Sequence, residues 1–287
     1  MEIKYTIQGL LIYAAIATYL SAFITTFLRR ERVGNFLYLL GFIAAVLAFI
    51  YRWYDVRHVP LQNLFEVFLC LGMISYAVSW FCRYTLRAGG YSGDVLIAAI
   101  MLVPAGFVFS AEPQRLPPAL QSWLFVPHVA VYALSYIFMA KAAFQAIFQL
   151  AGRNHKNEEP RLKAGAKPVL SRVEGYLAPR STWGLPAEEA TYRMICIGFP
   201  LLTLGLILGS CWGKLAWGDY WGWDPKELWS LASWLVYLGY FHFRYMFGKK
   251  YARINSLWAI AGMVFILITL FWVNLSNLFS GLHSYAT

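Results

Sequence analysis

The chain has 287 residues, of which 60% are apolar and 13% are charged, and its mean hydropathy is +0.53. This composition excludes an ordinary soluble globular domain and is typical of an integral membrane protein. The net charge of +10 does not indicate a nucleic-acid partner, because most of the basic residues gather between apolar runs and are not interleaved with a nucleic-acid-binding fold. We therefore predict an all-α, polytopic membrane protein with no nucleic-acid partner.

Apolar runs long enough to span a bilayer recur along the whole chain, because such a span needs roughly 20 residues of helix. We predict about eight membrane-spanning helices that form a single domain over 1–287. Their expected ranges are 6–28, 34–51, 61–82, 94–110, 127–149, 191–211, 226–246 and 254–275. The first run lacks a positively charged leader, so we expect a helix there and not a signal peptide. In the sixth range Gly205, Gly209 and Gly213 recur every four residues, which predicts a helix face that another helix approaches closely.

The distribution of basic residues predicts the orientation of these helices. Of the 24 Lys and Arg residues, seventeen fall between spans on one side, six on the other, and Lys141 lies inside the fifth span. Because loops rich in Lys and Arg stay in the cytoplasm, both termini are expected outside. The segment 151–190 is then a cytoplasmic loop, and 212–226 is an outer, Trp-rich loop. We expect Lys141 to extend its flexible stem to the cytoplasmic surface.

The sequence WGDYWGWDPKELW, residues 217–229, holds four of the twelve tryptophans. Its second half predicts the start of a helix, with Asp224 as N-cap, Pro225 at the first helical position and Glu227 completing a capping box. The tryptophans have two interpretations. They are an aromatic belt that anchors the protein at the membrane surface, or they form a flat surface for a planar ligand.

The histidines favour the planar ligand. His128 lies at the outer start of the fifth span, and His283 lies just beyond the eighth, so the two can converge on the Trp-rich loop from separate helices. Imidazole is a common axial ligand of haem iron, and an aromatic surface between two imidazoles suits a porphyrin. Any of four outer basic residues could bind its propionates, and the sequence does not choose among them. These are Arg57, Arg115, Lys214 and Lys226.

Two further histidines remain after His155, which we place in the cytoplasmic loop. His242 lies inside the seventh span, roughly 24 Å from its outer end. An ionisable group at that depth is a candidate functional residue, or else a neutral histidine bonded to a neighbouring helix. His58 is on the outer rim, and the sequence leaves its role open. The four cysteines form no C-x-x-C pair, so we expect neither a thiol–disulfide nor a zinc role.

Three motifs carry a family resemblance. Residues 217–244, WGDYWGWDPKELWSLASWLVYLGYFHFR, resemble the Trp-rich WWD signature of the cytochrome c assembly proteins, and specifically their CcsA (ResC) branch of System II. HVPLQNLFE at 58–66 and GLHSYA at 281–286 are similar to the same branch. The resemblance runs from about residue 50 to the C-terminus.

The resemblance implies a function. CcsA-type proteins work with a CcsB (ResB) partner, carry haem b to the outer face of the membrane and attach it to the C-x-x-C-H segment of apocytochrome c. The chain would then be one subunit of a cytochrome c haem lyase, active with its partner, and a separate system would reduce the apocytochrome thiols. The expected location is the bacterial cytoplasmic membrane, or alternatively the thylakoid membrane.

The resemblance also implies roles for individual residues. His128 and His283 would be the axial ligands of the outer haem. His242 would bind the iron of a haem within the membrane, with its second ligand from the partner. The haem-presenting loop would comprise Trp217, Trp221, Trp223 and Asp224.

Two other hypotheses stay open. The chain could be a haem carrier that never performs attachment, closer to the CcmC or HemX relatives, which would bind haem but yield no covalent cytochrome. It could instead be a membrane scaffold whose tryptophans are only anchors, which would bind no haem and would tolerate the loss of His128 or His283.

Overall fold

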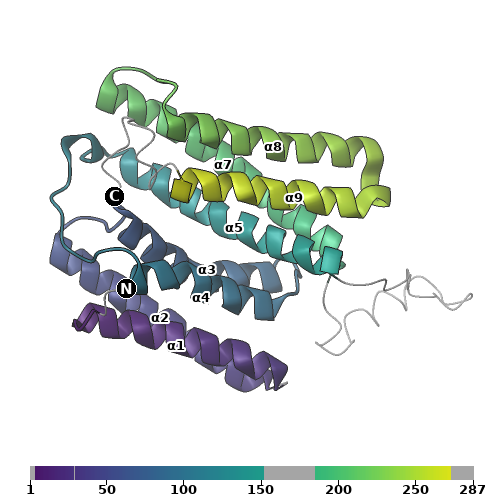
Figure 1. Cartoon of the computed structure of the whole chain (residues 1–287), viewed down its shortest axis with the longest axis horizontal. Helices are drawn as coiled ribbons and strands as arrows, with labels where there is room; N and C mark the ends of the chain where they lie inside the picture. Colours follow the sequence, from purple (N-terminus) through teal and green to yellow (C-terminus); the bar gives the residue numbers. More distant parts are fainter. Residues whose placement is uncertain (1–3, 29, 152–184, 273–287) are drawn as a thin grey trace, which may run out of the picture.

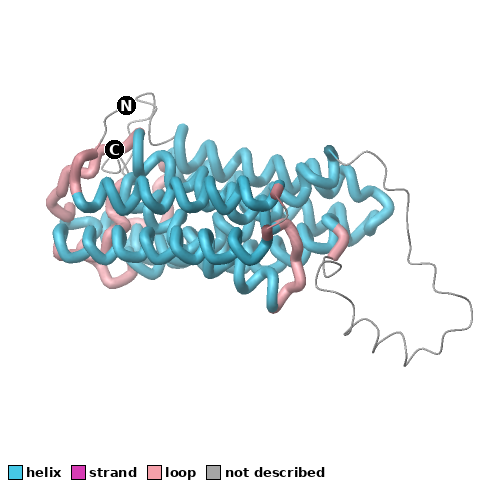
Figure 2. Tube along the Cα trace, turned by 90° about the horizontal axis from the view of Figure 1, so that it is seen from below, coloured by secondary structure: helices cyan, strands magenta, loops and turns pink. Residues whose placement is uncertain are grey.

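The computed structural model describes residues 4–28, 30–151 and 185–272, and within these residues it contains helices and connecting loops but no strand (Figures 1 and 2). Short 3-10 helices η1 (Pro118–Leu120) and η3 (Gly248–Tyr251) lie between the long helices, and a π-helix, η4 (Ile268–Trp272), continues the last one. The long helices are α1 (Ile7–Phe27), α2 (Glu31–Val56), α3 (Leu64–Tyr84), α4 (Tyr91–Phe107), α5 (Phe125–Ala151), α7 (Ala187–Trp217), α8 (Pro225–Phe247) and α9 (Ala252–Leu267).

Where the structure describes them, all eight predicted ranges fall on helices, which confirms an all-α, polytopic membrane protein. Within the described residues six helical segments are long and apolar enough to cross a membrane, and the last of them, Pro225–Phe271, contains both α8 and α9. Helix α4 is apolar but has 17 residues. The number of crossings and the side on which the termini lie stay predictions.

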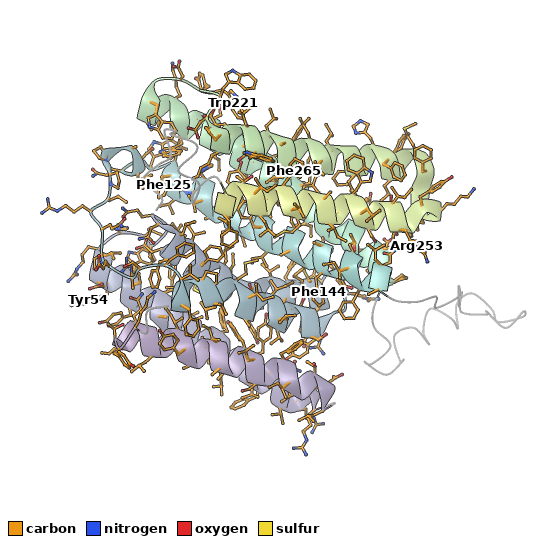
Figure 3. The ribbon with its side chains drawn as sticks, in the orientation of Figure 1. Tyr54, Phe125, Phe144, Trp221, Arg253 and Phe265 are labelled. Atoms are coloured by element: carbon orange, nitrogen blue, oxygen red, sulfur yellow. The ribbon has the colours of Figure 1, made fainter. Side chains whose placement is uncertain are left out.

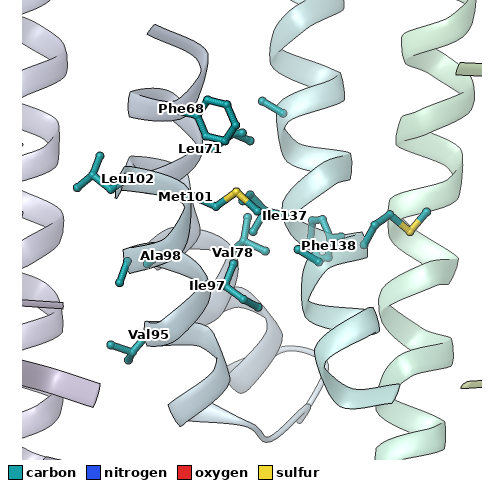
Figure 4. Close-up of a cluster of buried hydrophobic side chains, with 14 of the residues drawn as sticks. Phe68, Leu71, Val78, Val95, Ile97, Ala98, Met101, Leu102, Ile137 and Phe138 are labelled. Carbon is teal, nitrogen blue, oxygen red and sulfur yellow. The ribbon is translucent and has the colours of Figure 1, made fainter. Parts of the chain in front are cut away.

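The helices form two groups that meet along α5. Helices α1 to α4 make one group, and α5, α7, α8 and α9 make the other (Figure 1). The two groups share a core in which Val78 of α3 and Met101 of α4 face Ile137 and Phe138 of α5 (Figure 4). Helices α5 and α7 make the most extensive pairing of all. The predicted small-residue face of α7 lies against α5 at Gly205 and Gly209, where an added Cβ would touch α5 side chains.

The two ends of the bundle separate the loops as the distribution of basic residues predicts. Tyr54, Phe125 and Trp221 lie at one end, and Phe144 and Arg253 lie at the other (Figure 3). The predicted outer segments beside these three residues therefore share one end of the molecule. Most of the predicted cytoplasmic loop, 151–190, lies outside the described residues, although α5 ends at Ala151 and α7 already begins at Ala187.

The expectation that Lys141 reaches the cytoplasmic surface is wrong. Its side chain is 3% exposed and forms an ion pair with Asp94 of α4. The other carboxylate oxygen of Asp94 accepts a hydrogen bond from Ser79 Oγ of α3 at 2.5 Å. A buried ion pair persists when the geometry is good and further hydrogen bonds satisfy its remaining atoms. Lys141 therefore joins the two helix groups inside the membrane.

The Lys141–Asp94 pair predicts that a single substitution destabilises the protein more than the double substitution does. Lys141→Met leaves the Asp94 carboxylate buried without its cation and should destabilise the protein by about 3 kcal/mol. Adding Asp94→Asn should recover much of that loss. Thermal unfolding in detergent measures both. Lys249→Met, which removes an exposed partner of Glu189, is the control and should change the melting temperature little. Equal melting temperatures for wild type and Lys141→Met would contradict the interpretation.

Candidate functional site

A cavity of about 180 Å³ lies at the end of the second helix group that is predicted to face outward. Helices α5, α7 and α8, the π-helix η4 and the segment 61–64 before α3 all contribute to its wall, which is largely apolar. Its aromatic and charged lining residues are Phe125, His128, Tyr132, Tyr136, Trp212, Trp217, Trp221, Lys226 and Glu227. The cavity therefore contains three of the predicted haem-site residues, His128, Trp217 and Trp221, and one of the four candidate propionate-binding residues, Lys226.

The imidazole of His128 is fixed by its neighbours on α7. Its Nδ1 lies 2.9 Å from the carbonyl oxygen of Gly205. Because a carbonyl can only accept, Nδ1 carries the proton and the lone pair is on Nε2. Histidines that bind metals typically donate their other ring N–H in this way, which sets the tautomer and the ring orientation. In this tautomer Nε2 is the ring atom with which His128 could bind a metal, so the predicted ligand role is compatible with the geometry.

Gly209 makes room for this ring. A Cβ at this position would lie 2.6 Å from His128 Cε1 and 3.0 Å from Nδ1, closer than any side-chain carbon can sit. The four-residue glycine spacing predicted helix packing without chemistry. The structure places one of these glycines directly against the candidate ligand.

Trp212 was missed as a site residue, although it lies just upstream of the Trp-rich motif. Its ring stacks on His128, with centroids 5.7 Å apart, and makes an edge contact with Trp217 at 4.7 Å. Its Nε1 donates to the Ala119 carbonyl at 2.9 Å. A signal in the sequence could have found it. Trp212 is three residues after Gly209, and residues at this spacing lie on the same face of a helix, so both face α5. Tyr132 and Tyr136, missed as well, repeat the same face of α5 at four-residue steps from His128.

The tryptophans of the motif divide between the wall and the surface. Helix α7 extends to Trp217, so the non-helical part of the predicted outer loop is limited to about residues 218–224. Trp221 lines the cavity, whereas Trp223 is outside the lining and is 66% exposed. Trp223 also has φ +56°, in the left-handed region, and its ring meets that of Trp221 edge-on. A bulky residue held in this conformation costs about 1–3 kcal/mol and marks a backbone held by its surroundings.

Asp224 is a helix cap, as the sequence predicts. Its Oδ2 accepts from Lys226 N at 3.2 Å, and Glu227 Oε2 accepts from Asp224 N at 3.1 Å, which completes the capping box at the start of α8. Glu227 Oε2 also accepts from Gly222 N at 2.8 Å. Two carboxylates thus tie the tryptophan loop to the helix. Asp224 is buried but does not line the cavity.

A buried ion pair on the other wall orders the segment 61–64. Arg52 Nε and Glu66 Oε1 are 2.9 Å apart with both side chains essentially buried, and Glu66 Oε2 accepts from Gln62 N at 2.8 Å. Arg52 also donates to the Ala111 carbonyl, and Gln62 Nε2 donates to that of Arg115 at 3.1 Å. One arginine therefore connects α2, α3 and the loop after α4 beside the cavity.

The other histidines lie elsewhere. His242 is on the exposed face of α8, five residues before its end, with Nδ1 donating to the Leu238 carbonyl at 2.9 Å, and it is not part of the cavity. His58 follows α2 and donates from Nδ1 to the Val59 carbonyl at 3.1 Å. His283, the predicted second outer ligand, and His155 lie outside the described residues, so the convergence of His128 and His283 stays a prediction.

Comparison with known proteins identifies the family. Residues 9–283 match the model of the family described as "Cytochrome C assembly protein". The chain belongs to this family. The "Cytochrome c biogenesis protein CcsA" of Parasynechococcus marenigrum (strain WH8102) is 33% identical over 255 residues, covering 82% of this chain and 80% of that protein. The CcsA of Guillardia theta is 31% identical over 282 residues, covering 89% of this chain and 88% of that protein.

A solved structure agrees with the fold. The "Cytochrome c Heme Lyase CcmF" superposes with a TM-score of 0.60 at 18% identity, over 94% of this chain and 48% of CcmF. This chain thus spans about half the length of CcmF. The likeness supports the helical architecture, and the CcsA relatives support a role in cytochrome c biogenesis.

The capping geometry predicts how substitutions of Asp224 behave. Asp224→Ala removes the cap and should destabilise the start of α8 by about 1 kcal/mol, whereas Asp224→Ser should keep most of that stability because a serine oxygen also caps. Limited chymotrypsin cleavage of the 218–224 loop and thermal unfolding measure the effect. Asp219→Ala, at an exposed acid of the same loop, is the matched control. Equal cleavage of the Asp219→Ala and Asp224→Ala chains would rule out the structural role.

Proposed function

We propose that this CcsA-type chain presents haem b at the outer face of the membrane for thioether attachment to the C-x-x-C-H segment of apocytochrome c. In this proposal the chain is one subunit of a cytochrome c haem lyase whose other subunit resembles CcsB. The observation that carries the proposal is the geometry of His128, whose Nε2 carries the lone pair, in a cavity walled by tryptophans.

The cavity fits the chemistry of a porphyrin. A haem has a flat apolar body, and the walls offer apolar and aromatic side chains from Trp212, Trp217 and Trp221. Imidazole is an established axial ligand of haem iron, and the second axial position would be taken by His283. Haem is the cargo of this protein, and its iron and ring bring the reactivity.

The attachment reaction requires positioning more than acid–base groups. Each cysteine S–H adds across one haem vinyl group, so that sulfur bonds to one vinyl carbon and hydrogen to the other. Holding the ring in one orientation with its vinyl edge accessible can supply several kcal/mol toward such a step. The Gly205 carbonyl, the stacked Trp212 and the capped loop are the parts of this chain that would hold His128 and the tryptophans in place.

His242 has a separate role in the proposal. Its exposure on α8 and its distance from the cavity support a second haem position in the cytoplasmic half of the membrane, completed by a ligand of the partner. Haem would pass from there to the outer site. The host membrane would be the bacterial cytoplasmic membrane or the thylakoid membrane.

Replacement and rescue of His128 test the proposal. We expect wild-type protein, purified with its partner, to give a b-type bis-imidazole spectrum and a pyridine haemochrome. His128→Gly should lose most of the outer haem, and added imidazole should restore it by entering the space that the side chain leaves. His155→Gly is the control and should keep the haem. Unchanged haem content in His128→Gly would overturn the proposal.

The same variants, expressed in cells, distinguish between the competing hypotheses. Co-expression with the partner and a c-type cytochrome reports covalent attachment through haem staining of denatured protein. A haem carrier would show the spectrum but no covalent product. A membrane scaffold would show neither and would tolerate the loss of His128.

The contact with Gly209 makes an independent prediction about positioning. Gly209→Ala places a methyl group in the space of the imidazole and should weaken haem binding about tenfold, because a packed site cannot absorb the added volume without strain. Gly198→Ala, on the same helix face, meets the flexible end of Met139 at 3.0 Å and is the control. Absorbance titration with haem measures both variants. Equal affinity in Gly209→Ala and wild type would show that the ring does not depend on this glycine.

A further inference from the structure

The charged residues that line the cavity gather at the start of α8, and an aromatic surface for a planar ligand does not require them. Its charged lining residues within the described chain are Lys226 and Glu227, both in the first turn of α8. Glu227 has a structural task, since its Oε2 accepts from the backbone N–H groups of Gly222 and Asp224. Lys226 therefore contributes the positive charge of this wall, which apart from these two residues is largely apolar.

The other three candidate basic residues lie outside this cavity. Lys214 is exposed and donates from Nζ to the Gly218 carbonyl at 2.5 Å. Arg57 is exposed and stacks over the ring of Tyr54, with its guanidinium carbon 4.3 Å from the ring centre. Arg115 is also exposed and is absent from the cavity wall. The structure therefore distinguishes among four residues that the sequence left equivalent.

We infer that Lys226 binds a carboxylate of the porphyrin and thereby selects a ligand with free propionates. This inference rests on the proposed function and adds to it a residue that recognises the ligand's acidic edge. An ammonium attracts an anion more strongly beside an apolar wall than in open water, because the local dielectric is lower and salt screens it less. Charge-assisted hydrogen bonds of this kind are among the strongest that a site can offer.

The anchor also fixes the direction of the ring. In protoporphyrin the two propionates lie on one edge and the two vinyl groups lie toward the opposite edge. With His128 of α5 at the iron and Lys226 of α8 at a propionate, the ring is held at two points from two helices. The vinyl edge is then directed away from the start of α8, which leaves it for the incoming thiols.

The test compares two porphyrins that differ only at their two propionate groups, which are charged in one and esterified and neutral in the other. Iron(III) protoporphyrin IX and its dimethyl ester are titrated by absorbance into the full chain with its partner, purified in detergent without haem. We expect wild type to prefer the free acid by about tenfold or more, the factor that corresponds to one charge-assisted hydrogen bond. Lys226→Met should lose that preference, because its affinity for the free acid should fall while its affinity for the ester stays unchanged. Lys226→Arg should retain it, and so should Lys214→Met, the control at an exposed lysine in the last turn of α7.

Four outcomes would overturn the inference. The Lys226→Met protein could still prefer the free acid. It could also bind both porphyrins equally more weakly, as general damage to the cavity would cause. Wild type could bind both porphyrins equally, in which case haem binding stands and the role of Lys226 falls. If wild type bound neither, the proposed function itself would fail and the inference with it.

Discussion

The close approach of α5 and α7 is the constraint on which the candidate site depends. Glycines on α7 let the helices come near enough for His128 to reach the Gly205 carbonyl across the interface. That carbonyl belongs to a helix interior, where one lone pair serves the helix and a second remains available. The same contact leaves no space for a side chain at Gly209. The orientation of the imidazole therefore depends directly on the packing of α5 against α7, since a change in the helix spacing would also turn the ring.

A second constraint acts on the tryptophan loop. Seven residues separate the end of α7 from the start of α8. The Glu227 carboxylate binds the backbone N–H groups of Gly222 and Asp224 in the loop, and the Asp224 carboxylate caps α8 at Lys226 N. The loop keeps Trp223 in a left-handed conformation that a large side chain rarely adopts. Interfacial anchoring alone would not require such a backbone. The acids that make the motif look unsuited to a membrane are the groups that give the loop its shape.

The sequence was sufficient for features that depend on near neighbours in the chain. The helix ranges followed from apolar runs, and the cap of α8 followed from the order of Asp224, Pro225 and Glu227. Contacts between distant helices were not accessible in this way. Lys141 was expected at the surface because no rule of spacing connects it to Asp94, 47 residues earlier. The contacts of Trp212 and Gly209 with His128 were overlooked for the same reason, since they depend on the rotation of α7 against α5. The placement of His283 stays a prediction.

The stacking of Trp212 on His128 has an optical consequence. Three of the cavity residues are tryptophans, and indole emission overlaps the strong near-ultraviolet absorption of porphyrins. Energy transfer between them is efficient at contact distance, so a porphyrin in this cavity would quench those indoles far more than exposed tryptophans on distant surfaces, such as Trp80 of α3. The residues that shape the cavity would therefore also serve as an intrinsic fluorescent reporter of its occupancy, with no added label.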